Sequence, residues 1–215
     1  MEHIYCISGF GADERAFSKL NFGAHSVNYL PWQLPGKNET LLQYIQRFIE
    51  QIDQPDPILV GLSFGGMVSI EIAKQIPVKK IFMISSVKIA AEMPWYFRLA
   101  GKTRINKILP LKPYSFLEPI ENYNLGLQTE EEKVLVREYR KNINPQYSNW
   151  AINQIINWQN TFTPGNVIHI HGSNDHIFPI KNIAADYIIR GGGHFMVMNR
   201  AKEVNDILRH ELNTK

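Results

Sequence analysis

The stretch PILVGLSFGGMVSIEIA, residues Pro57 to Ala73, decides the fold prediction because its character changes at a single serine. Its first six residues, Pro57–Leu62, form the continuous apolar run that is typical of a strand buried on both faces. A helical pattern follows from Met67. Ser63 lies at the junction between glycines, and this arrangement predicts a sharp strand-to-helix turn that presents a nucleophilic hydroxyl.

The glycines around Ser63 have a geometric explanation. In such a turn the residues two before and two after the serine crowd each other, so both must be small. Gly61 and Gly65 occupy those places, and Gly66 eases the packing of the helix. The alternative is a glycine-rich turn that binds a phosphate. That alternative is disfavoured because Ser63 replaces the second glycine of G-x-G-x-x-G, and the Gly-Lys-Ser/Thr of a Walker loop is absent.

The rest of the chain predicts an α/β fold with a mostly parallel sheet, because short strand-like runs alternate with amphipathic helical patterns. The helical patterns cover Glu39–Ile52, Met67–Ile76 and Asn199–Leu212. The expected strands are His3–Ser8, His25–Leu30, Pro57–Leu62, Lys80–Ser85, Asn166–His171 and Ala185–Arg190.

The segment 87–164 interrupts this alternation, since it shows helical patterns and no convincing strand. At roughly 78 residues it is too long for a simple crossover between two strands. We therefore expect a helical cap, residues 87–164, inserted into an α/β core made of residues 1–86 and 165–215.

Ser63 needs a base, and the base needs a carboxylate that orients it. His194 is the favoured base because it follows the last expected strand and a run of three glycines, in a loop that can reach the top of the sheet. Asp175 follows the fifth expected strand, at the edge where active sites of α/β proteins gather. Asp186 is the rival acid, but it lies near the start of its strand. The order serine, aspartate, histidine is that of one triad class.

Two backbone N–H groups are expected to stabilise an oxyanion. One belongs to Phe64, at the start of the helix after Ser63, and the other to Phe10, in the Gly-Phe-Gly turn after the first strand. A tight turn at Phe10 with no catalytic role remains an alternative.

Composition and motifs exclude several classes of function. The net charge of +3 is too small to indicate a nucleic-acid partner, and no run approaches the length of a membrane-spanning helix. The single cysteine, Cys6, cannot form an internal disulfide, which favours a cytoplasmic location. The string HIHGSNDH, His169–His176, only loosely matches a zinc-ligand pattern. No metal and no cofactor are therefore expected.

The segments SGFGADERAF, GLSFGGM, HGSNDHIFP and GGGHFMV occur in this order across nearly the whole chain, which thereby resembles the α/β-hydrolase superfamily. The resemblance is to its small, cofactor-independent serine hydrolases of the esterase type. It implies a minimal sheet of about six strands flanked by helices, a helical cap insertion, and a triad at the carboxyl edge of the sheet.

The expected function is hydrolysis of a carboxylic ester or thioester of a small to medium, largely apolar substrate through an acyl-enzyme. Four aromatic residues are candidates for substrate binding: Trp95, Phe97, Trp150 and Phe195. Two alternatives stay open. One is a weakly catalytic or non-catalytic ligand receptor on the same fold, and the other is a C–C bond hydrolase or perhydrolase. The sequence does not predict an oligomeric state.

Overall fold

A computed structural model describes residues 1–103 and 117–214 of the protein. It contains a six-stranded sheet in the order β2-β1-β3-β4-β5-β6, and every pair of neighbouring strands is parallel. The strands are β1 (His3–Ile7), β2 (Ser26–Tyr29), β3 (Ile58–Leu62), β4 (Lys80–Ile84), β5 (Val167–Gly172) and β6 (Tyr187–Ile189). The predicted α/β-hydrolase sheet of about six strands is thus confirmed.

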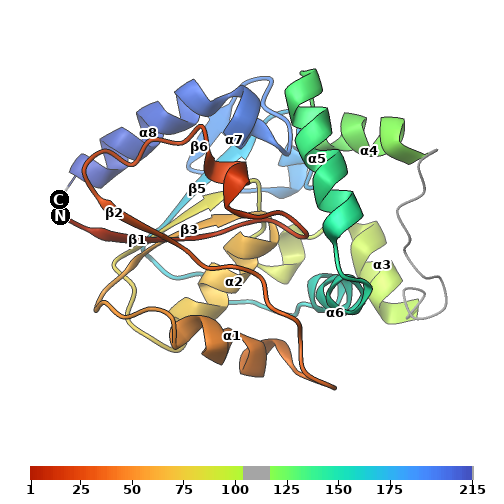
Figure 1. Ribbon diagram of the computed structural model, residues 1–215, viewed down its shortest axis with the longest axis horizontal. Coiled ribbons are helices and arrows are strands. Elements are labelled where there is room, and N and C mark those ends of the chain that lie inside the picture. Colours follow the sequence, from red (N-terminus) through yellow and green to blue (C-terminus); the bar gives the residue numbers. More distant parts are fainter. Residues whose placement is uncertain (104–116, 215) are drawn as a thin grey trace.

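Helices cover both faces of the sheet (Figure 1). On one face α1 (Leu41–Ile49) and α2 (Phe64–Ala73) pack against alternate side chains of the strands, such as Leu59 and Met83. On the other face α7 (Met196–Asn199), α8 (Ala201–Asn213) and the short helix η1 (Glu14–Phe17) cover the remaining side chains, including Cys6 and Val60. Burial on both faces explains why the strand sequences are continuous apolar runs rather than alternating ones.

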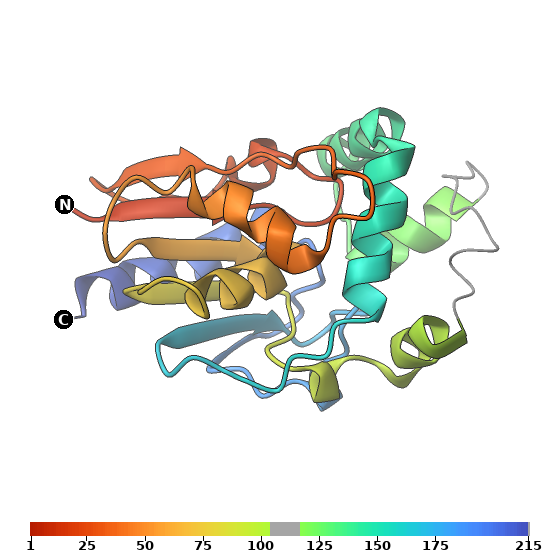
Figure 2. The same cartoon turned by 90° about the horizontal axis from the view of Figure 1, so that it is seen from below.

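Between β4 and β5, the described residues form helices and connecting segments. They are η2 (Ala90–Glu92), α3 (Trp95–Thr103), α4 (Glu118–Leu125), α5 (Glu130–Asn142) and α6 (Pro145–Ile156). Helices α3 to α6 gather beyond the carboxyl ends of the strands, while both chain termini lie at the opposite end (Figure 2). The predicted cap, residues 87–164, also includes residues 104–116, which lie outside the described part of the chain.

Local sequence signals set the limits of these helices. The Thr129 hydroxyl oxygen accepts a hydrogen bond from the N–H of Glu132, and the Glu132 carboxylate accepts one from the N–H of Thr129, so a capping box starts α5. Asn144 caps α6 and Pro145 occupies its first turn. Gly126, with φ of 72°, ends α4 in the left-handed conformation. None of the helices in the described ranges has the length and apolar character needed to cross a bilayer.

The sheet topology defines where a ligand can approach. From β1 the chain moves to β2 on one side and then returns to β3 on the other, so the strand order reverses between β1 and β3. Open α/β sheets bind ligands in the crevice at the carboxyl ends of the strands beside such a reversal. The register pairs Ile7 with Gly61, which brings the loop after β1 next to the turn after β3.

Candidate active site

Ser63 lies in the turn between β3 and α2 with φ of 52° and ψ of −116°. A non-glycine residue with positive φ is strained, and such strain persists only where neighbouring contacts hold it. Here the N–H of Ser63 donates to the carbonyl of Ile84 at 2.9 Å, and the hydroxyl of Ser86 donates to the carbonyl of Ser63 at 2.7 Å. The Ser63 side chain is half-buried. Its hydroxyl is therefore held in place at the carboxyl edge of the sheet.

The glycines of this turn are required by close backbone approaches. A Cβ atom on Gly65 would lie 2.0 Å from the carbonyl oxygen of Ile7, and one on Gly61 would lie 2.5 Å from the carbonyl oxygen of Gly65. On Gly66 a Cβ atom would meet the Ser86 hydroxyl at 2.6 Å. The first two contacts involve backbone atoms and cannot be relieved by a change of rotamer.

His194 connects Ser63 to Asp175. Its Nε2 atom lies 2.9 Å from Ser63 Oγ, and its Nδ1 atom lies 2.8 Å from Asp175 Oδ2. Because a carboxylate only accepts hydrogen bonds, Nδ1 carries the proton and Nε2 is free to accept one from the Ser63 hydroxyl. The three predicted residues, which are far apart in the sequence, thus form one hydrogen-bonded chain. Asp186, the rival acid, instead accepts a hydrogen bond from the backbone N–H of His169 at 2.8 Å.

The Asp175 carboxylate is almost fully buried and well supplied with donors. Oδ1 accepts hydrogen bonds from the backbone N–H groups of Ile177 at 2.8 Å and Phe178 at 2.9 Å. Burial raises the pKa of Asp175, but the adjacent His194 and these hydrogen bonds outweigh it and leave the pKa below its usual range. Asp175 is therefore an anion at neutral pH, as needed to stabilise a charged His194 ring.

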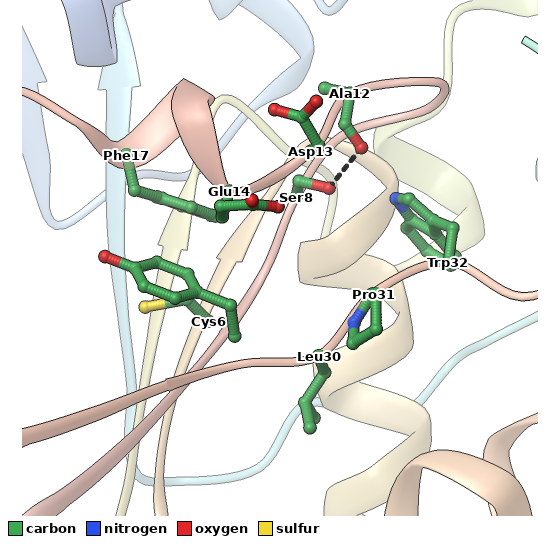
Figure 3. A pocket seen from close by; sticks show the side chains of 10 residues that line it. Cys6, Ser8, Ala12, Asp13, Glu14, Phe17, Leu30, Pro31 and Trp32 are labelled. Carbon is green, nitrogen blue, oxygen red and sulfur yellow. Dashed lines mark hydrogen bonds between the residues drawn. The ribbon is translucent and has the colours of Figure 1, made fainter. Parts of the chain in front are cut away.

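The loop after β1 lies against Ser63. A Cβ atom on Gly9 would lie 3.4 Å from the Cβ of Ser63, and Phe10 follows directly. The Ser8 hydroxyl donates to the carbonyl of Ala12 at 2.7 Å, which closes the loop on itself (Figure 3). Phe64 is the first residue of α2, where backbone N–H groups have no partner within the helix. Both expected oxyanion donors thus belong to segments next to Ser63.

Trp32 is a site residue that the sequence did not single out. Its indole N–H donates to the carbonyl of Gly9 at 3.0 Å, and its ring stacks on Phe64 with centroids 5.0 Å apart and planes 7° apart. One side chain therefore contacts both segments that carry the expected oxyanion donors. Tyr147 of α6 also stacks on Phe10, at 6.0 Å between ring centroids.

The four aromatic residues predicted to bind substrate occupy different places. Phe97 contacts Phe178 at 6.1 Å between centroids, and Phe178 contacts the His194 ring at 5.5 Å. The Trp150 ring lies 6.4 Å from that of Phe64.

The other two of these aromatic residues have a different setting. Trp95 is 67% exposed and contacts Tyr96. Phe195 is 5% exposed and packs in the core under α7 and α8. Burial in that core favours a packing role for Phe195.

Two cavities lie beside the loop after β1. One of about 150 Å³ is lined by residues that include Cys6, Ser8 and Trp32 (Figure 3). The other, of about 250 Å³, lies between this loop and the α5–α6 corner, with Trp32 and Tyr147 among its lining residues. Cys6 is buried, and burial raises the pKa of its thiol, so it acts as a small apolar residue. No cluster of three or more potential metal ligands occurs in the described residues.

Comparison with known proteins agrees with this geometry. The sequence pattern of the alpha/beta hydrolase family matches residues 4–207. The chain belongs to this family. No curated protein sequence matches it significantly.

Solved structures extend the similarity to the whole fold. The bromoperoxidase from Bacillus anthracis aligns with a TM-score of 0.71 at 16% identity, over 99% of this chain and 92% of that one. An esterase from Exiguobacterium antarcticum aligns with a TM-score of 0.69 at 14% identity, over 100% of this chain and 92% of that one. An epoxide hydrolase from Bacillus megaterium aligns with a TM-score of 0.69 at 16% identity, over 100% of this chain and 94% of that one. At these identities the alignments establish the shared fold.

Proposed function

We propose that this alpha/beta hydrolase cleaves a carboxylic ester or thioester through an acyl-enzyme formed on Ser63. One observation carries the proposal. The His194 ring lies between Ser63 Oγ, at 2.9 Å, and Asp175 Oδ2, at 2.8 Å, in the tautomer that can accept the serine proton. A hydroxyl with such a base and such an orienting carboxylate is an activated nucleophile.

In the first half-reaction, Ser63 Oγ forms a bond to the acyl carbon and its proton moves to His194 Nε2. The carbonyl π electrons move onto the oxygen, which becomes an oxyanion. When the oxyanion collapses, the bond to the alcohol or thiol leaving group breaks, and His194 returns its proton to that group. Asp175 stabilises the transient imidazolium throughout, because its carboxylate remains ionised.

In the second half-reaction, a water molecule gives its proton to His194 and attacks the acyl carbon. The acid product leaves, and Ser63 recovers its proton. The N–H groups of Phe10 and Phe64 are proposed to stabilise the oxyanion in both halves. The Trp32 contacts to Gly9 and Phe64 support this proposal, since they fix the two loops relative to each other.

The aromatic residues around the site favour a largely apolar substrate of small to medium size. Phe10 and Phe64, in the two segments next to Ser63, stack on other aromatic rings, and Phe178 contacts the His194 ring. The Phe97 ring contacts the Phe178 ring in turn, so a series of ring contacts runs from His194 through Phe178 to Phe97. Apolar walls with a few convergent polar groups are typical of small-molecule sites.

A panel of nitrophenyl esters with graded acyl chains tests the proposal. The wild-type protein should hydrolyse at least one chain length, and Ser63→Ala should lower kcat by at least about a thousandfold while thermal unfolding is unchanged. Ser18→Ala is the matched control, because it removes a hydroxyl outside the site, whose hydrogen bond goes to the sulfur of Met198. Full activity in Ser63→Ala would refute the mechanism. Fluorophosphonate labelling of Ser63 without turnover of any ester would favour the receptor alternative.

A further inference from the structure

A second imidazole contacts the Asp175 carboxylate. His171, at the end of β5, is fully buried, and its Nε2 atom lies 2.8 Å from the carbonyl oxygen of Phe178 and 3.4 Å from Asp175 Oδ2. The same Oδ2 atom accepts the hydrogen bond from His194 at 2.8 Å. Two rings therefore face one carboxylate oxygen, and the proposed catalytic scheme uses only one of them.

The protonation of His171 follows from its partners. A carbonyl oxygen only accepts, so His171 Nε2 carries a proton, and the positive end of this N–H dipole lies beside Asp175 Oδ2. Burial lowers the pKa of His171, which is thus neutral at neutral pH with an unprotonated Nδ1 atom.

The tautomer of His171 in turn determines the role of His169. Its Nε2 atom lies 3.3 Å from His171 Nδ1, so it must be the donor in this contact. Burial, and next the proximity of His171, lower the pKa of His169 to about 3, so this ring is also neutral. Lys88 contributes to the same lowering, and Asp186 bonds the His169 backbone. Together with Asp175 and His194, these are the charged and titratable groups that the described part of the chain places against the histidine pair.

We propose that His171 tunes the strength of the His194 base by sharing Asp175 Oδ2 with it. This inference rests on the proposed function, in which His194 accepts the Ser63 proton. A donor N–H beside Oδ2 offsets part of the carboxylate charge, so Asp175 stabilises the His194 imidazolium less strongly. His194 then loses its proton at a lower pH, and the hydrolase is active further into the acidic range. His171 is a positioning residue here, because it acts on the substrate only through Asp175.

The variants His171→Leu and His171→Gln test this role. In His171→Leu the acidic limb of the kcat/KM profile should move to higher pH by about half to one pH unit, with KM unchanged. His171→Gln keeps an amide N–H near the position of Nε2 and should retain most of the wild-type profile. An acidic limb that stays at the wild-type pH in active His171→Leu protein would overturn the inference. A merely structural role would lower stability or plateau kcat without moving that limb.

Ile170→Val is the matched control, since Ile170 is an equally buried neighbour on β5 that packs on the opposite face of the sheet. It should keep the wild-type pH profile.

The titration of the His194 ring, followed by NMR in histidine-labelled protein, reads the same effect without turnover. If the wild-type protein cleaves no ester but this titration still moves upward in His171→Leu, the proposed function fails and the tuning stands. If esters are cleaved and the titration does not move, the tuning fails alone. If His171→Leu does not fold, His171→Gln decides, since a shift as large as half a pH unit in that donor-retaining variant would overturn the inference.

Discussion

Gly65 offers the sharpest test of the turn that presents Ser63. In Gly65→Ala the new Cβ atom would lie 2.0 Å from the Ile7 carbonyl oxygen and 2.6 Å from that of Ser8, whereas Cβ atoms essentially never approach closer than 3.0 Å. The end of β1 and the start of α2 would have to separate by about 1 Å, since neither contact involves a side chain that can rotate.

The size of the effect can be worked out from these contacts. Overpacking of a well-packed core costs about 1–3 kcal/mol, and a clash between backbone atoms belongs at or above the upper limit. For a domain of this size, about 3 kcal/mol corresponds to a fall in Tm of about 6–12 °C. Because the displacement separates Ser63 from the loop that carries Phe10, we also expect kcat to fall about a hundredfold.

Thermal unfolding by far-UV circular dichroism measures the first effect, and hydrolysis of the best ester in the panel measures the second. Gly165→Ala is the matched control, because no atom lies within 4 Å of its added Cβ and its backbone is not in the left-handed region. It should match the wild type in both assays. If Gly65→Ala unfolds within 2 °C of Gly165→Ala, the close approach of β1 to this turn is wrong; that tolerance is about the shift expected for 1 kcal/mol.

Two further predictions concern the surroundings of the triad. Trp32→Leu removes the hydrogen bond to Gly9 and the stacking on Phe64, so kcat should fall about tenfold with a smaller change in KM; an unchanged kcat would exclude an oxyanion role for these segments. His169 should make folding stability depend on pH. Its ring takes up a proton below about pH 6.5 when unfolded but only near pH 3 when folded, so the free energy of unfolding falls as pH drops between these values, by up to about 1.4 kcal/mol per pH unit. Urea titrations should show a flatter dependence in His169→Gln, and an identical slope would contradict the prediction.

The sequence predicted the sheet and the placement of Ser63 because both depend on local patterns. Apolar runs identify strands that are buried on both faces, and all six expected runs form strands of the parallel sheet. The turn at Ser63 is equally local, since the glycines at positions 61 and 65 are separated by only three residues. His194 and Asp175 were found from their order and from the rule that carboxyl ends of parallel strands share an edge. Their catalytic roles remain predictions.

Other contacts between distant segments could not be predicted from the sequence. Trp32 acts through a stacking contact with Phe64 and a bond to Gly9, and nothing in its own neighbourhood indicates either partner. His169 and His171 gave a signal, since alternate residues of a strand point to the same face. The contact of His171 with Asp175 was missed because it depends on how the loop after β5 folds back on the strand.

The placement of loop side chains was also difficult to predict from the sequence, as Phe195 shows. Phe195 follows His194, and a glycine-rich loop does not reveal which of two successive side chains points toward the site. In the structure His194 points to Ser63 while Phe195 joins the core, where its N–H also donates to the carbonyl of Leu125 at 2.9 Å. His194 and Phe195 are successive residues of one turn, so burial of Phe195 helps to hold His194 in position.

The position of the base is therefore set from two directions. The core holds the His194 loop through Phe195, and the α4–α5 corner holds it from above, because Gly126 and Gly193 approach so closely that a Cβ atom on Gly126 would lie 2.9 Å from the Gly193 Cα. Asn199 adds a hydrogen bond to the Gly126 carbonyl at 3.0 Å. A displacement of that corner would therefore move the loop that carries the base, whereas α6 contacts the other segments of the site, with Tyr147 stacked on Phe10 and Trp150 lying 6.4 Å from Phe64.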